Sequence, residues 1–193
     1  KVSKKSSSIF ILKSLDLAHK LGLKKDVAGI INCPINKNLL NKSKIGVTEY
    51  FATKCAVNDN SEVMLIKNKK LMVSPLTTHL DIKSIPRKLT QKLIIKKIKV
   101  IDIWYKKEFN KKAKIAILGL NPHNAELRKN SEEKKIIIPA IKKLKNVNIK
   151  IDGPYVSDTI FINDYKKFDI IVGMYHDQVL APFKALFKFD AIN

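Results

Sequence analysis

The amino-acid sequence predicts an α/β fold built on a largely parallel sheet. Short apolar runs typical of buried strands alternate along the chain with longer segments whose apolar residues recur at helical spacing. Such alternation is typical of parallel strands joined by covering helices. At 193 residues with 45% hydrophobic content, the chain is long enough to bury one sizeable core, or a core divided between two lobes.

The individual elements follow from apolar spacing and from end signals. A first helix is indicated by the helical spacing of Leu12, Leu15 and Ala18, and Gly22 marks its end. A later helix is indicated by Ser131, a suitable N-cap residue, and by the acidic residues that follow in the first turn. The expected helices cover residues 9–23, 38–44, 85–109 and a segment from 131 onward. The expected strands cover residues 27–31, 63–66, 71–76, 113–120, 147–151 and 168–174.

The formal net charge of +21 raises the question of a nucleic-acid partner. The lysines are spread along the whole chain, and the only arginines are Arg87 and Arg128, although arginine dominates base readout. We therefore interpret the charge as a solvated basic surface and expect no nucleic-acid partner. An anionic, phosphorylated substrate would still be attracted by this field.

Cysteine usage and hydropathy bear on the compartment. Cys33 and Cys55 lack a CxxC spacing, which argues against a disulfide framework or zinc knuckle, and Cys33 is expected to be a small buried residue. No apolar run reaches the roughly 18 residues that span a bilayer, and no signal peptide is recognisable. We expect a cytoplasmic protein without membrane contact. Because the chain starts at Lys1 without a methionine, we also expect it to begin part-way through a longer one.

Three of the four histidines stand just beyond predicted strands. These are His79, His123 and His176, whereas His19 falls within a helical pattern. The carboxyl ends of parallel strands share one edge of a sheet, where ligands bind, so the three imidazoles can converge there. Three protein ligands with one open position form a catalytic metal site, for which Zn, Co, Ni or Fe is suitable. The alternative is that each is a loop histidine with only a local hydrogen bond.

The residues around these histidines resemble the motifs of the 4-hydroxythreonine-4-phosphate dehydrogenase family. Residues 119–123 read GLNPH, residues 174–178 read MYHDQ and residues 77–80 read TTHL, as in that family. Residues 153–159, GPYVSDT, are similar to its GP-x-x-ADT segment, and residues 34–37, PINK, to an early P-x-x-K stretch. The blocks follow the family order and cover nearly the whole chain.

The resemblance implies an isocitrate/isopropylmalate dehydrogenase-like fold with α/β/α layers, truncated at both ends. Residues 1–45 would be the remnant of a first α/β domain, and residues 46–193 an incomplete second domain that binds metal and dimerises. The resemblance also implies a homodimer with active sites at the subunit interface. There, His79, His123 and His176 would hold a divalent metal (Zn, Co or Mg), with one of them supplied by the partner subunit.

The same resemblance places Thr48, Lys184 and Asn193 at substrate-binding positions. A lysine ammonium is a compact charge suited to a phosphate or carboxylate. No general base is identified by the resemblance. Asp177 and Asp158 are candidates, and each could instead orient a metal-bound histidine.

The implied activity is NAD-dependent oxidation and decarboxylation of 4-phosphooxy-L-threonine (4-hydroxythreonine 4-phosphate) to 3-amino-2-oxopropyl phosphate, in pyridoxal 5'-phosphate (vitamin B6) biosynthesis. The absence of a GxGxxG motif agrees with a family whose nucleotide site is not the Rossmann fingerprint.

One position departs from the family pattern. Val47 stands before Thr48 where the family has histidine, and losing a hydrogen bond to a charged group costs about 1.5–3 kcal/mol. Val47, together with the expected truncation at both ends, leaves two alternatives open. One is a dehydrogenase of a related phosphorylated hydroxy acid, such as a phosphothreonate or phosphoerythronate, and the other is an inactive truncated relative.

Overall fold

The chain divides into two compact units, Lys1–Glu62 and Val63–Asn193. This computed structural model describes residues 3–24, 27–36, 39, 46–57 and 61–193. The division falls later than the boundary predicted between residues 45 and 46, so the helix after Gly46 groups with the first unit.

The described part of the first unit contains helices α1 (Lys4–Gly22) and α2 (Val47–Lys54). The helix predicted at residues 9–23 is thus confirmed and starts earlier, because the Ser3 side chain accepts a hydrogen bond from the N–H of Ser6 and caps α1. The helix predicted at residues 38–44 falls almost wholly outside the described residues.

The prediction of a strand at residues 27–31 is wrong. In the described part of this unit the run has no strand to pair with, and Ile31 is fully exposed. Ile30 lies near Gly22 of α1, but every residue of the run is exposed. Cys33 is exposed as well, contrary to the prediction that it is buried.

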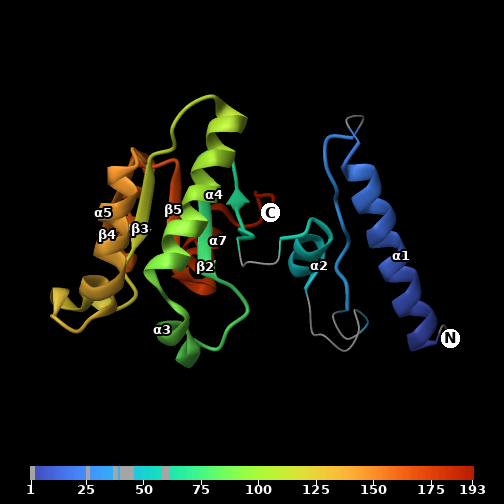
Figure 1. The fold of residues 1–193 in the computed structure, drawn as a ribbon, viewed down its shortest axis with the longest axis horizontal. Coiled ribbons are helices and arrows are strands. Elements are labelled where there is room, and N and C mark those ends of the chain that lie inside the picture. Colours follow the sequence, from blue (N-terminus) through green and yellow to red (C-terminus); the bar gives the residue numbers. More distant parts are fainter. Residues whose placement is uncertain (1–2, 25–26, 37–38, 40–45, 58–60) are drawn as a thin grey trace. The chain divides into compact units, whose positions relative to one another are not determined.

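The second unit is built on a five-stranded sheet in the order β1-β2-β5-β3-β4 (Figure 1). The strands are β1 (Ile66–Lys67), β2 (Met72–Thr77), β3 (Ile115–Leu118), β4 (Ile151–Tyr155) and β5 (Ile170–Tyr175). All neighbours are parallel except β1, which is antiparallel to β2. The predicted α/β architecture with a largely parallel sheet is confirmed.

Two strands differ from their predicted positions. Of the run at residues 63–66, only Ile66 joins the sheet, so β1 is shorter than expected. The strand predicted at residues 147–151 begins only at Ile151, because a turn with Asn148 in the left-handed region (φ 61°) first ends the preceding helix.

The helices of the second unit are α3 (Ile85–Lys88), α4 (Gln91–Phe109), α5 (Ile138–Asn146), α6 (Ser157–Ile160) and α7 (His176–Phe187). The single helix predicted at residues 85–109 is broken, because Thr90 is extended and its side chain caps α4 by accepting from Leu93 N–H. As predicted, Ser131 caps a helical segment: its hydroxyl accepts from Lys134 N–H ahead of the π-helical turn that runs into α5.

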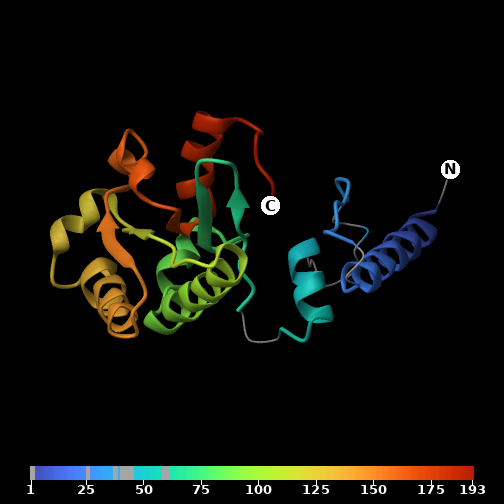
Figure 2. The ribbon, with the colours of Figure 1, turned by 90° about the horizontal axis from the view of Figure 1, so that it is seen from above.

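Side chains alternate across the sheet and pack into two cores, with helices on both faces (Figure 2). Ile115 and Ile117 pack into the core formed with α4 and α5, whereas Ala116 and Leu118 pack into the core formed with α7. The second unit therefore has α/β/α layers. Among the described helices, none has the length and apolarity needed to traverse a bilayer.

Candidate metal centre

The carboxyl ends of three neighbouring strands carry the predicted metal ligands. β5 lies between β2 and β3 and is parallel to both, so the chain leaves all three strands at one edge of the sheet. Thr77 of β2 is paired with Tyr175 of β5, which brings the exits toward His79 and His176 side by side. This edge is where ligands bind in open α/β sheets.

His79 and His176 lie close together at this edge. Their ring centroids are 6.1 Å apart, and the rings are tilted by 34°. Two imidazoles on one ion must place their centroids within about 6.5 Å, because each metal–nitrogen bond is about 2.1 Å. His79 is exposed and His176 is partly exposed, so both rings are open to an ion from solution. The separation of the two rings is thus below the upper limit for two ligands of one ion.

The side chain of Asp177 contacts the ring of His176. Asp177 Oδ1 lies 2.7 Å from His176 Nδ1, and a carboxylate can only accept at that distance. In the neutral imidazole the proton is therefore on Nδ1, and the lone pair of Nε2 is the one open to a metal. A carboxylate that fixes tautomer and ring orientation in this way is a recurrent partner of metal-bound histidines.

His123 begins a left-handed turn that follows β3. Its backbone angles are φ 49° and ψ 28°, and positive φ continues through Leu127. The turn is held by Asn124, whose side-chain amide donates to Pro154 O at 2.9 Å. The imidazole of His123 is exposed.

The chain between β3 and His123 is fixed by the buried carboxylate of Glu133. Its Oε1 accepts from the N–H groups of Leu120 and Asn121, each at 2.8 Å, and the Asn121 amide also donates to Glu132 and Glu133. Burial raises the pKa of the Glu133 carboxyl, but these hydrogen bonds outweigh burial and hold the pKa below its ordinary value. Glu133 therefore acts as a charged anchor for this loop.

The three histidines do not form a complete metal site within one chain. Among the described residues, no group of three or more histidine, cysteine, aspartate or glutamate side chains could hold an ion. Within one chain, His79 and His176 lie close together as predicted. His123 does not form a ligand group with them.

The other predicted site residues are spread over both units. Asp158 lies in the first turn of α6 and is exposed, and Lys184 is exposed on α7. Asn193 is the exposed last residue. Thr48 is exposed in α2 of the first unit, directly after the half-buried Val47. These positions leave their substrate-binding roles as predictions.

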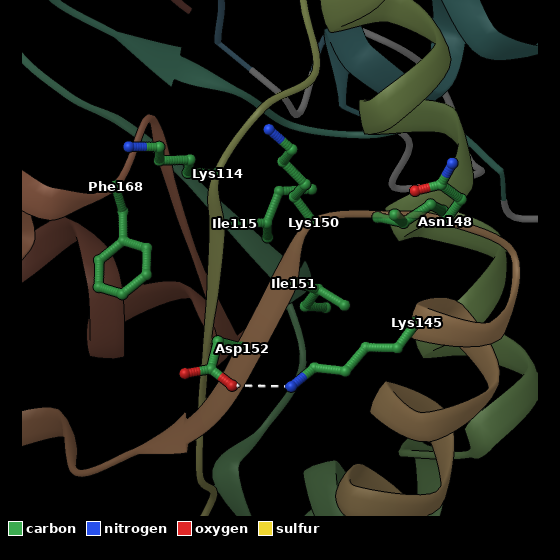
Figure 3. A pocket seen from close by; sticks show the side chains of 9 residues that line it. Lys114, Ile115, Lys145, Asn148, Lys150, Ile151, Asp152 and Phe168 are labelled. Carbon is green, nitrogen blue, oxygen red and sulfur yellow. Dashed lines mark hydrogen bonds and ion pairs between the residues drawn. The ribbon is translucent and has the colours of Figure 1, made fainter.

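A pocket of about 400 Å³ lies at the amino ends of β3 and β4 (Figure 3). These strand ends are opposite to the carboxyl edge that carries the histidines. Lys114, Lys145 and Lys150 line it, and Lys145 is paired with Asp152 at 2.9 Å. None of the predicted site residues contributes to its lining. We therefore place the candidate site at the carboxyl edge.

A family model described as pyridoxal phosphate biosynthetic protein PdxA matches residues 1–193 of this chain. The chain belongs to the PdxA family. The resemblance found in GLNPH, MYHDQ and TTHL is thereby confirmed.

Individual PdxA relatives agree with this assignment. The 4-hydroxythreonine-4-phosphate dehydrogenase of Sulfurihydrogenibium sp. (strain YO3AOP1) is 40% identical over 184 residues, covering 93% of this chain and 56% of the relative. The 4-hydroxythreonine-4-phosphate dehydrogenase of Aquifex aeolicus (strain VF5) is 36% identical over 175 residues, which cover 89% of this chain and 54% of the relative. The chain thus spans about half the length of these curated relatives, which are dehydrogenases.

Solved structures show the same fold. The crystal structure of the 4-hydroxythreonine-4-phosphate dehydrogenase from Klebsiella pneumoniae superposes with a TM-score of 0.87 at 29% identity, over 98% of this chain and 59% of the other. The crystal structure of a terephthalate 1,2-cis-dihydrodiol dehydrogenase from Burkholderia xenovorans LB400 superposes with a TM-score of 0.70 at 22% identity, which shows a similar fold alone. The α/β fold with a mostly parallel, mixed sheet is therefore that of PdxA structures.

Sequence reasoning missed the residues that hold these loops in place. The sequence pattern identifies Glu133 only as part of an acidic first turn, and it indicates no role for Asn124 or Gln178. Gln178 belongs to the MYHDQ block, so the motif itself was an available signal. The contacts of Asn124 and Glu133 have no sequence signature, because they depend on how the loop after β3 folds back.

Proposed function

We propose that this chain is part of an NAD-dependent, metal-requiring 4-hydroxythreonine-4-phosphate dehydrogenase. It would oxidise and decarboxylate 4-phosphooxy-L-threonine to 3-amino-2-oxopropyl phosphate in pyridoxal 5'-phosphate biosynthesis. The observation that carries the proposal is the adjacent pair His79 and His176, with Asp177 on the second ring, at the sheet edge of a PdxA-family chain. The isocitrate/isopropylmalate dehydrogenase-like classification is part of this proposal.

The metal site would be completed by a second copy of the chain in a homodimer. His79 and His176 supply two ligands from one subunit, and His123 of the partner subunit supplies the third. Two observations support this arrangement: the described residues of one chain contain no complete ligand set, and His123 is exposed on a fixed loop. A divalent ion held there (Zn, Co or Mg) supplies Lewis-acid stabilisation of negative charge on the substrate during oxidation and loss of CO2.

The chain's own side chains would orient the ligands and bind the substrate. Asp177 keeps the proton of His176 on Nδ1 and directs Nε2 to the site. Lys184 would bind phosphate or carboxylate through its ammonium group, and Thr48 and Asn193 would add hydrogen bonds. Asp158, which is exposed beside Ser157, is available as the proton acceptor. NAD is the hydride acceptor in this proposal.

The test uses a chimaera in which segments of the Sulfurihydrogenibium relative extend this chain to the relative's length. NADH formation from 4-phosphooxy-L-threonine is measured before and after treatment with a chelator, and again after adding Zn²⁺ or Co²⁺. We expect the chelator to abolish turnover and metal to restore it. His79→Ala and His176→Ala should be inactive, whereas His19→Ala, a histidine of α1, should be active. Turnover that survives chelation would refute the proposal.

Val47 gives the proposal a test of substrate choice. Val47 is half-buried at the first position of α2, where a hydrocarbon side chain offers no hydrogen bond. In the chimaera, Val47→His should lower KM for 4-phosphooxy-L-threonine about ten- to a hundredfold, as expected for a regained hydrogen bond to a charged group. A panel with phosphothreonate and phosphoerythronate decides whether either is the better substrate. We further propose a cytoplasmic location, which the two free cysteines support.

A further inference from the structure

The carboxamide of Gln178 joins three segments that lead into the candidate metal centre. Gln178 is only 8% exposed. Its Oε1 accepts from the N–H of Met174 at 2.6 Å, and its Nε2 donates to Gly119 O at 2.6 Å and to Ser157 Oγ at 2.8 Å. Both N–H groups of the amide and its oxygen are therefore in use, which fixes the orientation of the carboxamide.

Each of these contacts lies just before a predicted site residue. Met174 precedes the turn from β5 into His176, and Gly119 begins the loop that leads to His123. Ser157 starts α6 and is followed by Asp158. One buried side chain thus sets the mutual position of the segments that carry two proposed ligands and a proposed proton acceptor.

Beyond the last directly paired residues of β3 and β5, the two strands are connected by the carboxamide of Gln178. The paired register of the two strands ends at Ile117 and Val172. Beyond that point, Gln178 stands between the carbonyl of Gly119 and the N–H of Met174, which are joined through the side chain instead of directly. The exits of β3 and β5 are therefore held apart by the width of a carboxamide, which opens the sheet edge where a ligand would bind.

The backbone around Gln178 leaves space for this arrangement. A Cβ at Gly173 would lie 2.9 Å from Gln178 Oε1 and 2.6 Å from a methyl carbon of Val179. Glycine at residue 173 is thus required for the carboxamide to approach β5 this closely.

We propose that Gln178 is a positioning residue for the metal centres of the dimer: its carboxamide fixes the exit that carries His176 to one centre and the loop that carries His123 to the other. The inference rests on the proposed function. Glutamate cannot replace glutamine here, because an ionised carboxylate only accepts hydrogen bonds and would oppose the Gly119 carbonyl. Methionine has a similar length but would leave the buried groups of Gly119 and Met174 unpaired.

The experiment measures Co²⁺ binding to the chimaera defined above, in which the dimer site can form, by the ligand-field absorption of the ion. We expect Gln178→Met and Gln178→Glu to bind Co²⁺ at least tenfold more weakly, with shifted absorption bands, since supporting residues of metal ligands typically change affinity 10- to 100-fold. The matched control is Gln91→Met on α4: the Gln91 amide also donates to a backbone carbonyl, that of Lys135, but away from the strand exits. The control should keep wild-type affinity and bands.

Further variants keep the test decisive. If the Gln178 variants do not fold by circular dichroism, Ser157→Ala removes one of the three hydrogen bonds and should shift the Co²⁺ bands in the same direction. Wild-type Co²⁺ affinity and bands in a folded Gln178→Met or, failing that, in Ser157→Ala would overturn the inference. His176→Ala separates the two proposals. If His176→Ala binds Co²⁺ like the wild type, the metal site itself is refuted. If His176→Ala loses Co²⁺ binding while Gln178→Met keeps it, only the positioning role of Gln178 is refuted.

Discussion

The hydroxyl of Thr77 donates a buried hydrogen bond to the carbonyl oxygen of Met174, with 2.7 Å between the two oxygens. Thr77 ends β2 and Met174 lies near the end of β5, so the bond ties the two strand exits that lead to His79 and His176. The short distance between the two imidazole rings follows from this tie and from the parallel pairing of the strands.

We expect Thr77→Val to lower the free energy of unfolding by about 1 kcal/mol, because it removes a buried hydrogen bond while keeping the shape of the side chain. It should also weaken Co²⁺ binding by loosening the pair of histidines. Urea denaturation measures the first effect and an absorption titration the second. The control is Thr159→Val, whose exposed hydroxyl makes a longer contact of 3.4 Å, and which should change stability by less than about 0.5 kcal/mol. Equal losses in both variants would contradict the role given to Thr77.

A second prediction separates the two aspartates that the sequence left as candidates. Only Asp177 contacts a histidine, at 2.7 Å, whereas Asp158 is exposed at the start of α6. Asp177→Ala should therefore weaken Co²⁺ binding 10- to 100-fold, and Asp158→Ala should leave it unchanged. In the chimaera, Asp158→Ala should lower kcat if it accepts the proton. A Co²⁺ affinity that falls equally in both variants would show that the contact at His176 is not what orients the ring.

Local patterns predicted the strands well where both faces of the sheet are covered. Residues 113–120 and 168–174 are near-continuous apolar runs because β3 and β5 each pack against helices on both sides. The run at residues 27–31 looks the same in sequence, but its residues are exposed and form no strand. An apolar run by itself fixes neither burial nor strand formation, because both need a partner surface that the run cannot specify. The order that inserts β5 between β2 and β3 is likewise set by long-range pairing.

The candidate site could be predicted as far as its strand ends and no further. The positions of His79 and His176 followed from parallel topology, which forces their strand exits to one edge. The bond from Gln178 to Gly119 joins residues 59 apart, and no periodicity encodes such a contact. The left-handed backbone at His123 was also unpredictable, because the turn contains no glycine to mark it.

The buried carboxylate of Glu133 gives a third prediction, for pH dependence. The pKa of Glu133 is below its ordinary value of 4.5 in the folded chain, because hydrogen bonds from Asn121 and Leu120 outweigh the effect of burial. A lowered folded pKa means that the stabilisation is complete above the unfolded pKa and is lost as the pH falls through the folded value. We expect unfolding free energy to fall below about pH 4.5, and to fall less steeply in Glu133→Gln.

Chemical denaturation from pH 7 to pH 3 measures this difference. The matched control is Glu108→Gln, the same change on the exposed side of α4. Glu133→Gln should also be less stable than the wild type near neutral pH, because an amide holds the two backbone N–H groups more weakly than a carboxylate does. Parallel acid profiles for Glu133→Gln and the wild type would contradict the anchoring role of the charge.

The last prediction concerns the left-handed turn that begins at His123. Glu126 lies in this turn with φ 50° and ψ 27°, a conformation that costs a residue with a Cβ about 1 kcal/mol or more. Glycine has no such penalty, although its greater freedom in the unfolded chain offsets part of the gain, by about 0.5–1 kcal/mol. Glu126→Gly should therefore be neutral or stabilising.

The same substitution in a helix should have the opposite effect. Glu108 is exposed like Glu126 but lies in α4, where glycine is disfavoured by about 1 kcal/mol. Urea denaturation should therefore find Glu126→Gly more stable than Glu108→Gly by about 1–2 kcal/mol, and Glu126→Ala close to the wild type, because alanine keeps the Cβ. If Glu126→Gly were as destabilised as Glu108→Gly, the loop that presents His123 would not hold a left-handed backbone.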